Sequence, residues 1–502
     1  MSVVSGPAAP NDDAQGRTAG LAFAQGTGFR TDSVDEWHRV HPVSPLVRGW
    51  LAVVALIFLF GRNSFDDLLA SIRSGGRHNP AGAPAWLILL FLGAAVVVFG
   101  IYFFLSWYYT RYQVTNDHVR VNSGVVFRRQ RQARIDRVQA IDVVQPLLAR
   151  IFALAELKFE VADAGKSAMK LSFLRLDEAQ RLRAAILARA SGMSVDPCRP
   201  SAAPQAPERA VLALTPGRIA GATLLSGISV AALALAAAAI GALYATGSPS
   251  ILAVFLPLAL AVAAAYWKAF TIDCNFRIAQ SPDGVRLRYG MLDTRAQTIP
   301  PGRVQAVGIT QSPWWRPAGW YRVHINVAGY GSDHRDSGPR TVVLPVGTEA
   351  EVMTILGLIF PDPGTADPLG VFRAGLRGKG TAHGFVHSPP RARLLDPLAW
   401  RRNGYRFTDT ALLCRHGVFF RRLQVVPHER TQSLSLFQGP LMRRLHLVNF
   451  ELHSTAGPVR PVVRHLDTAT AHELFTGQAA RAATARRIGR PDRWLEESNH
   501  EH

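Results

Sequence analysis

Several features of catalytic and metal-binding proteins are missing from this sequence of 502 residues. The three cysteines, Cys198, Cys274 and Cys414, lie far apart, which excludes a disulfide framework and a cysteine-based metal site. The sixteen histidines include no His-Glu-x-x-His spacing, and no Gly-x-Ser-x-Gly nucleophile turn occurs. The Gly-x-Gly steps at 329–331 and 378–380 lack the strand and helix around a phosphate loop. We therefore expect a non-enzymatic protein with no cofactor and no metal.

Charge is absent from one long stretch. Residues 219–267 contain no Asp, Glu, Lys or Arg, and a single polar break interrupts them at 246–250. Each half offers about 20 apolar residues, the length of helix that crosses the hydrocarbon core of a bilayer. The stretch predicts two transmembrane helices joined by a very short turn. Because these helices carry no ionisable groups of those four types, a proton relay or an ion-coupled transporter is not favoured.

A second apolar hairpin is expected upstream. Residues 81–110 are uncharged and end in Trp107-Tyr108-Tyr109, and these residue types favour the membrane interface. Its partner helix would lie at 49–61, between Arg48 and Arg62. The mostly polar segment before it differs from the short basic start of a cleavable signal. The sequence thus predicts four transmembrane helices in two hairpins.

Basic residues decide the expected orientation. The break at 246–250 has no Lys or Arg, whereas Arg209, Arg218, Lys268 and Arg277 flank the two helices on the other side. Lys and Arg collect on the cytoplasmic side of membrane proteins. We therefore expect a membrane protein whose N-terminus and folded modules are cytoplasmic.

The net charge of +20, from 56 basic and 36 acidic residues, favours a binding partner of opposite charge. Anionic lipid headgroups and nucleic acid both fit such a charge. The membrane is preferred here because the folded modules are tethered beside the bilayer and no DNA-binding motif is present. The expected partners are the lipid bilayer, anionic lipid headgroups and another membrane protein or a second copy of the chain, but no nucleic acid.

One motif occurs three times. It occupies residues 124–145, 290–311 and 417–438, and in each copy a Gly precedes an Arg by thirteen residues, that Arg precedes a Gln by two, and a second Gln follows six later. A Pro and then an Arg follow in every copy. A register kept three times indicates an array of one structural module.

Each module reads as antiparallel strands followed by a helix. The residues five and three positions before the motif Gly are apolar in all copies, which places both on one face of a strand: Val119 and Val121, Val285 and Leu287, Leu412 and Cys414. The Gly should lie in a hairpin turn, where a positive φ suits it. Acidic residues and Thr then begin an apolar helical pattern near 176, 348 and 467. A small barrel or sandwich with a helix over its open end would limit exposed sheet edges.

This arrangement resembles the bacterial pleckstrin-homology-like (YdbS/YdbT-type) multipass membrane proteins. The resemblance rests on the paired apolar helices, the Tyr-x-Val/Phe-Thr strand, the Gly turn, the Arg-x-Gln step and the Trp37-His-Arg-Val-His-Pro opening, and it covers about 37–480. It implies a pleckstrin-homology (PH)-like barrel plus helix for each module, in an α+β protein of the bacterial plasma (inner) membrane, and no established activity. No full transmembrane pair precedes the third module; the short apolar patch at 387–402 should lie at the membrane interface or pack on module two.

The expected organisation has nine parts, given by residue number: a disordered segment 1–36, transmembrane hairpin one 44–110, module one 111–190, a linker 191–216, transmembrane hairpin two 217–268, module two 269–360, a linker 361–395, module three 396–480 and a disordered tail 481–502.

Candidate binding residues come from the motif and from two basic runs. An Arg with a Gln two positions on could hold a phosphate or carboxylate on one strand face, and basic runs could meet lipid headgroups. The Arg–Gln pair can also recur because it holds the fold of each module, and this is the favoured interpretation. The alternative for the basic runs is that they form solvated strand edges. The candidates are Arg128, Arg129, Arg131, Arg137, Gln139, Arg303, Gln305, Arg421, Arg422, Arg430 and Gln432.

The function expected from the sequence is a membrane-bound scaffold. Three cytoplasmic modules would bind proteins or anionic lipid, in envelope maintenance or stress. The alternative is an accessory subunit of a membrane transport, export or resistance system. An enzyme is the least supported class, because no acid, base, nucleophile or metal set converges in the sequence.

Overall fold

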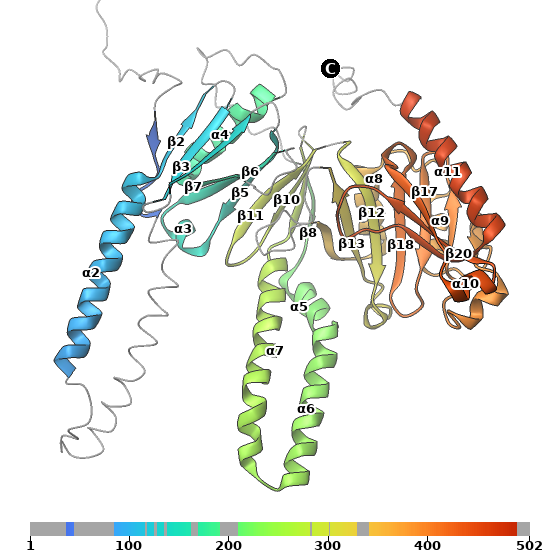
Figure 1. The fold of residues 1–502 in the computed structure, drawn as a ribbon, viewed down its shortest axis with the longest axis horizontal. Helices are drawn as coiled ribbons and strands as arrows, with labels where there is room; N and C mark the ends of the chain where they lie inside the picture. The colour runs from blue at the N-terminus through green and yellow to red at the C-terminus, as the bar shows by residue number, and fades with distance from the viewer. Residues whose placement is uncertain are drawn as a thin grey trace, which may run out of the picture.

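The structure is a computed structural model that describes residues 37–44, 85–115, 118–124, 128–134, 138–161, 169–190, 209–281, 284–300, 302–328 and 341–488. β-Sheets form a row, and apolar helices project from one side of it (Figure 1). The transmembrane helix expected at 49–61 lies outside the described residues, as do the segment 1–36 and the end of the tail.

Each repeat has a first group of three strands. In repeat one they are β2 (Arg111–Val114), β3 (His118–Ser123) and β4 (Arg129–Arg134), and β1 (His38–Arg39) pairs with β2. In repeat two they are β9 (Arg277–Ser281), β10 (Gly284–Tyr289) and β11 (Thr294–Ile299), and β8 (Arg209–Ala213) pairs with β9. In repeat three they are β16 (Gly404–Phe407), β17 (Ala411–His416) and β18 (Arg421–Pro427), and β15 (Val386–His387) pairs with β16. The predicted inward positions, from Val119 to Cys414, are all buried.

A second group of strands and a helix complete each repeat. They are β5 (Val138–Gln145), β6 (Leu154–Val161), β7 (Met169–Arg175) and α4 (Leu176–Ala190); β12 (Val304–Gln311), β13 (Tyr321–Val327), β14 (Val342–Gly347) and α8 (Glu349–Ile359); β19 (Ser433–Phe437), β20 (Leu447–His453), β21 (Val462–Asp467) and α11 (Thr468–Ile488). The expected C-terminal helix is present in all three, and α11 continues past residue 480, where the sequence placed the start of the tail. Thr348 and Glu351 form a capping box at the start of α8.

The motif glycines take the conformation expected of them. Their φ angles are 111° at Gly124, 103° at Gly290 and 80° at Gly417. A Cβ added at Gly290 would lie 2.0 Å from the Asp293 carbonyl oxygen, and one at Gly417 would lie 2.2 Å from that of Phe420. Only glycine fits these turns without rearrangement of the backbone.

The sheets do not stop at the repeat boundaries. One seven-stranded sheet has the order β7-β6-β5-β11-β10-β9-β8, and another has the order β14-β13-β12-β18-β17-β16-β15. Strand β11 pairs antiparallel with β5, and β18 pairs with β12. The modules are therefore layered sandwiches joined edge to edge rather than separate closed barrels. Pairing with a neighbour satisfies the edge backbone groups that closure would otherwise have to protect.

Each sandwich has a core between its two groups of strands. In module one, Val119 and Val121 of the first group share a cluster with Leu157 and Phe159 of the second, and Ile186 of α4 covers it. In module three, Leu412 and Cys414 meet Phe450, Val463 and Leu474 in the same way. The repeated apolar positions thus hold the two layers of each module together.

Two described helices are long and apolar enough to cross a membrane. They are α6 (Gly227–Thr246) and α7 (Leu252–Asp273), joined through Gly247 and the short η2 (Pro249–Ile251). Helix α2 (Ala85–Tyr109) is also apolar along its 25 residues. In Figure 1, α2 and the α6–α7 pair project from the same side of the row of sheets. The described residues contain two candidate membrane spans, so the predicted set of four is only partly represented.

A short helix couples the apolar pair to module two. Helix α5 (Pro216–Leu224) precedes α6, and its Arg218 donates from both terminal nitrogens to the Glu351 carboxylate of α8, at 2.8 and 2.5 Å. Burial alone would raise the pKa of Glu351, but the hydrogen bonds from Arg218 and the Thr348 amide lower it. Trp315 also donates its indole N–H to the Ala222 carbonyl of α5, at 3.2 Å. The base of the helical hairpin is therefore fixed to a folded module.

The segment before module three, expected at the membrane interface or on module two, packs its buried residue on module three. Ala392 is buried with Met442 and Leu447 of module three, not with module two, because its chain neighbours complete a small apolar cluster there. Helix α9 (Pro368–Leu376), in the predicted linker, covers the outer face of β17 and β18. Module three, which no predicted transmembrane pair precedes, thus has one face of its first strand group covered by helix α9.

Candidate functional site

The second motif Gln has one structural role in all three repeats. Gln145, Gln311 and Gln438 each donate from the side-chain amide to a backbone carbonyl nine residues later, at 3.1, 3.4 and 3.1 Å. The bond closes a strand–short helix–strand turn through α3 (Leu147–Ile151), η3 (Pro313–Trp315) or α10 (Pro440–Arg444). The motif's Pro stands at the start of each short helix, where its missing N–H leaves no helical bond unmade.

The Arg-x-Gln pairs do not share one arrangement. Gln305 is buried and its amide points back to the carbonyl of Arg303, at 3.4 Å. Arg430 ends η6 (His428–Arg430) with its guanidinium 3.7 Å from Glu429, while Gln432 is exposed and its backbone N–H pairs with His453. In repeat one, Arg137 lies outside the described residues, and Gln139 is in β5 with its side chain undescribed. The described Arg–Gln pairs therefore do not repeat a common contact.

The two basic runs lie at hairpin turns. Arg128 is exposed beside Tyr109, the last residue of α2, with its guanidinium 5.7 Å from the ring centre. Arg129, whose side chain is not described, and exposed Arg131 follow on edge strand β4. In repeat three, Arg421 donates to the Gln311 side chain at 3.4 Å, and Arg422 is exposed. The basic cluster of module one thus begins at the end of an apolar helix.

The hairpin turns of repeats one and two both meet apolar helices. The amides of Gly290 and Met291 donate to the carbonyls of Cys274 and Thr271 at the end of α7, at 2.8 and 2.9 Å. The corresponding turn of repeat one brings Arg128 to Tyr109. In repeat two the motif turn is therefore bonded to the end of an apolar helix, and in repeat one Arg128 lies beside the end of another.

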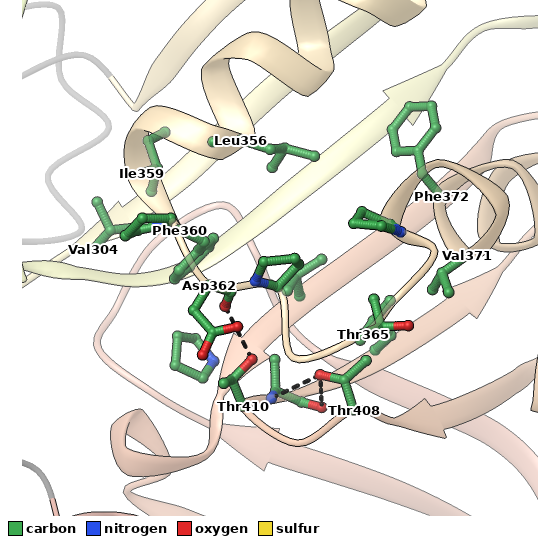
Figure 2. Close-up of a pocket in the computed structure, with 18 of the residues that line it drawn as sticks. Val304, Leu356, Ile359, Phe360, Asp362, Thr365, Val371, Phe372, Thr408 and Thr410 are labelled. Atoms are coloured by element: carbon green, nitrogen blue, oxygen red, sulfur yellow. Dashed lines mark hydrogen bonds between the residues drawn. The ribbon is translucent and has the colours of Figure 1, made fainter.

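A cavity of about 670 Å³ lies at the junction of modules two and three. Figure 2 shows Leu356 and Ile359 from α8 on one side, Val371 and Phe372 from α9 on another, and Thr408 and Thr410 beside β17. The linker after α8 crosses it, held by a 3.2 Å bond from the Thr410 hydroxyl to the Asp362 carbonyl. Gly302, Val304 and Arg430 also line it, so two copies of the motif contribute to one cavity.

The chemistry of this cavity suits binding rather than catalysis. Its walls are mostly aliphatic and aromatic, and the ionisable residues that line it are Asp362, Glu429 and Arg430. Asp362 accepts a bond from the Gly364 amide and Glu429 lies beside Arg430, so these groups are engaged in local structure. An apolar cavity with a few polar groups at its edge is typical of sites for apolar ligands.

Two buried arginines, which the sequence analysis missed, hold α9 in place. Arg402 donates to the carbonyls of Gly375, Gly378 and Gly417 at 3.1, 2.9 and 2.7 Å. Arg415 donates to Ala374 at 3.0 Å and to Gly380. Burial lowers the pKa of each to about 10, so both remain charged at neutral pH. Cations at the C-terminal carbonyls of a helix are favoured by its dipole.

No cluster of three or more possible metal ligands is found in the described part of the chain. Cys274 and Cys414 are buried and unpaired, and burial raises the pKa of Cys414 to about 12. A thiol with so high a pKa is protonated at neutral pH and is a poor nucleophile. Cys414 therefore does not fit the role of a catalytic nucleophile.

The fold defines a class of protein: repeated two-layer β-modules with C-terminal helices, connected to an apolar helical hairpin. A family model for the bacterial PH domain matches residues 53–190, 222–359 and 382–482. These segments make up most of the chain, so the chain belongs to the bacterial PH domain family and carries three copies. The family resemblance drawn from the sequence is confirmed.

A curated relative is the UPF0699 transmembrane protein YdbT of Bacillus subtilis (strain 168). It is 22% identical over 354 residues, which cover 66% of this chain and 70% of the relative. The relative's name and the apolar helices α6 and α7 together indicate membrane association. No solved structure matches the chain.

Proposed function

We propose that this chain is a multipass membrane protein that presents three PH-like modules at the cytoplasmic surface as a non-enzymatic scaffold. Its apolar helices anchor the row of modules, and its basic surfaces favour anionic lipid and acidic protein partners. The role would be to hold such partners in a fixed arrangement beside the membrane, in envelope maintenance or stress.

The observation that carries this proposal is the continuity of the sheets across the repeats. Backbone pairing of β5 with β11 and of β12 with β18 fixes each module against the next. Side chains add to these junctions: Arg183 of α4 donates to the Thr298 hydroxyl at 2.6 Å, and Asn326 of β13 bonds Val459 of module three. Three modules with fixed spacing suit a scaffold better than three independent domains on flexible linkers would.

The orientation follows from charge. The α6–α7 turn contains no Lys or Arg, while Arg218 and Lys268 flank the other ends of these helices. In Figure 1 the modules all lie at the flanked ends. The asymmetry of basic residues favours a cytoplasmic location for the modules and an external turn.

Cysteine labelling in intact cells tests this topology. In a Cys198→Ser background, Ser248→Cys reports on the α6–α7 turn and Ala480→Cys on exposed α11. Cys274 and Cys414 are buried and contribute little background. A membrane-impermeant maleimide should label Ser248→Cys in intact cells and Ala480→Cys only after permeabilisation. Labelling of Ala480→Cys from outside would refute the proposal.

Crosslinking of the full chain in cells, followed by mass spectrometry, tests the scaffold role. Crosslinks from the exposed module surfaces to lipid or to several proteins would support it. One stoichiometric membrane partner, co-purifying with the chain, would instead favour an accessory subunit of a transport or export system.

The cavity supports a second candidate role, the binding of an apolar molecule between modules two and three. Gly357 of α8 lines the cavity, and a Cβ added there meets no atom within 4 Å, so Gly357→Phe should fill part of the cavity. Thr354→Phe, at an exposed position of the same helix, is the matched control. Native mass spectrometry should show a bound apolar molecule in the wild type and the control but not in Gly357→Phe. An empty wild-type protein would refute this role.

A further inference from the structure

The hairpin turn of repeat three differs from its two counterparts. The turn at Gly290 is bonded to the end of α7, and Arg128, four residues after Gly124, lies beside the last residue of α2. The turn at Gly417 is instead held by arginines: Arg402 donates to the Gly417 carbonyl at 2.7 Å, and Arg316 donates to the carbonyls of Val418 and Phe419. No apolar helix of the described residues is bonded to this turn. It nevertheless carries two large apolar side chains.

These side chains belong to a wider exposed surface, which we call the base of module three. Its members are large apolar side chains exposed by more than half, namely Leu394 at 76%, Leu398 at 64%, Phe419 at 60%, Phe420 at 58% and Leu441 at 56%. Contacts behind the surface join its parts. Arg402 ties the chain after Leu398 to the turn, and Ala392 packs on Met442 beside Leu441. Such a concentration of exposed apolar side chains marks an interaction surface.

Basic residues surround the base. Arg393, Arg401, Arg443 and Arg444 are all exposed on the same segments as the apolar side chains. Arg316 and Arg421 flank the turn. The nearby carboxylate of Asp396 accepts bonds from the Asn403 side chain and the Ala399 amide, so it already has partners. Apolar side chains framed by arginines match the interface of an anionic bilayer.

The position of the base relative to the apolar hairpin favours a membrane as its partner. Arg316 follows η3, and Trp315 of η3 is bonded to Ala222 of α5, the helix that leads into α6. The turn is thus two contacts away from the start of a candidate membrane span. In Figure 1, α10 lies on the lower side of module three, and α6 and α7 project from module two toward that same side of the row of sheets. A membrane crossed by α6 and α7 would run beneath this surface.

We propose that the base of module three is a monotopic membrane contact that inserts Phe419, Phe420 and the leucines into the interface of an anionic bilayer. This contact replaces the transmembrane helices that adjoin the corresponding turns of modules one and two. It rests on the proposed function in one respect, because it requires α6 and α7 to cross the membrane.

Spin-label accessibility in nanodiscs tests the contact with the full-length protein. In the Cys198→Ser background, Phe420→Cys and Leu398→Cys probe the base. The control is Ala480→Cys, an exposed position in the C-terminal half of α11, and this helix runs away from α10 toward the C-terminus (Figure 1). The bilayer contains phosphatidylcholine with phosphatidylglycerol. Labels at the base should collide more with oxygen, which concentrates in lipid, than with a water-soluble nickel complex. The control label should show the reverse.

A substitution at the turn makes the test specific. Phe419→Ser with Phe420→Ser changes only exposed side chains, and the Leu398→Cys label should then become accessible to nickel. Leu369→Ser is the matched control, because Leu369 is exposed at the start of α9. Its neighbour Pro368 lines the cavity together with Ala411, the first residue of β17, so this substitution should leave the label in lipid. Removal of phosphatidylglycerol from the bilayer should raise nickel access to the labels at the base but not to the label at Ala480→Cys.

Three results would overturn the proposal. They are nickel access at the base equal to that at Ala480→Cys, no effect of the double Phe substitution, and spin–spin broadening that reveals a second copy covering the base. None of these affects labelling of the α6–α7 turn in cells. Failure of this contact is therefore distinguishable from failure of the proposed topology.

Discussion

Asn326 offers a sharp test of the junction between modules two and three. Its side chain, 1% exposed, donates to the Val459 carbonyl at 2.7 Å and accepts from the Val459 amide at 2.9 Å. Val459 in turn covers Gly308, where an added Cβ would lie 2.9 Å from the valine. Asn326→Ala removes both bonds to Val459 and leaves its buried amide without an acceptor. It also removes two longer contacts of the Asn326 amide, to the Thr455 carbonyl at 3.3 Å and the Ser454 hydroxyl at 3.5 Å.

The expected effect follows from the cost of that amide. An unsatisfied buried donor costs about 1–3 kcal/mol and the second lost bond about 1 kcal/mol, so the junction should weaken by about 2–4 kcal/mol. Since 1.4 kcal/mol is a factor of ten, local opening should increase roughly 30- to 700-fold. Hydrogen exchange of the Val459 amide, resolved by mass spectrometry with fragmentation, measures this directly.

Asn449→Ala is the matched control for Asn326→Ala. The Asn449 side chain accepts from the His465 amide at 2.9 Å within module three, away from the junction. This variant should accelerate exchange at His465 and leave Val459 protected. Unchanged exchange of the Val459 amide in Asn326→Ala would refute the inference that side chains lock the two modules together.

Three further predictions concern module three. Gly417→Ala should lower the free energy of unfolding by about 2–3 kcal/mol, because φ is positive and the new Cβ meets the Phe420 carbonyl; thermal unfolding of the detergent-solubilised chain checks this. Gln438→Met should cost about 1 kcal/mol by the same assay, since its bond to the Leu447 carbonyl is lost. Burial, with nearby arginines, lowers the pKa of His416 to about 4, below the 6.5 of the unfolded chain. The unfolded state then binds the extra proton between these pH values, so stability should fall by about 3 kcal/mol from pH 6.5 to 4, and His416→Gln should lessen this loss in melting curves against pH.

Controls and contrary results for these variants are simple. Gly439→Ala, with open space and a negative φ, should leave the unfolding temperature nearly unchanged. Equal effects of Gly417→Ala and Gly439→Ala would contradict the steric reasoning. If the Gln438→Met variant is as stable as the wild type, the hydrogen bond of this repeated Gln contributes nothing to the free energy of unfolding. An identical pH dependence in His416→Gln would show that another group controls the acid transition.

Local patterns predicted the inside of each module well. The alternation at Val119 and Val121 and its counterparts identified the buried strand face, because side chains of a strand alternate between two faces. The motif glycines were expected at turns, and their positive φ confirms it. The uncharged stretch identified α6 and α7, since the length of an apolar helix is visible in composition alone.

The sites were less accessible to this reasoning. The Arg-x-Gln step attracted attention as a binding pair, yet the structure gives Gln305 and Gln432 different surroundings. The second Gln carries the repeated contact, to a carbonyl nine residues away. Spacing shows that a residue is needed but not which atom it touches. The burial of Arg402 and Arg415 could not be predicted from the sequence. Arginine is usually exposed, and only the structure shows the backbone carbonyls that accept hydrogen bonds from these two side chains.

The sequence by itself determined the repeat, the buried face of the early strands, the glycine turns and the apolar hairpin. These follow from short-range periodicity and backbone preference, which are local properties. Only the tertiary structure decided that β5 pairs with β11 and β12 with β18, that α9 covers module three, and that a cavity forms at the second junction. Pairing between edge strands uses backbone groups that nearly every residue has, so the side-chain pattern does not predict which strand of the next module an edge strand pairs with.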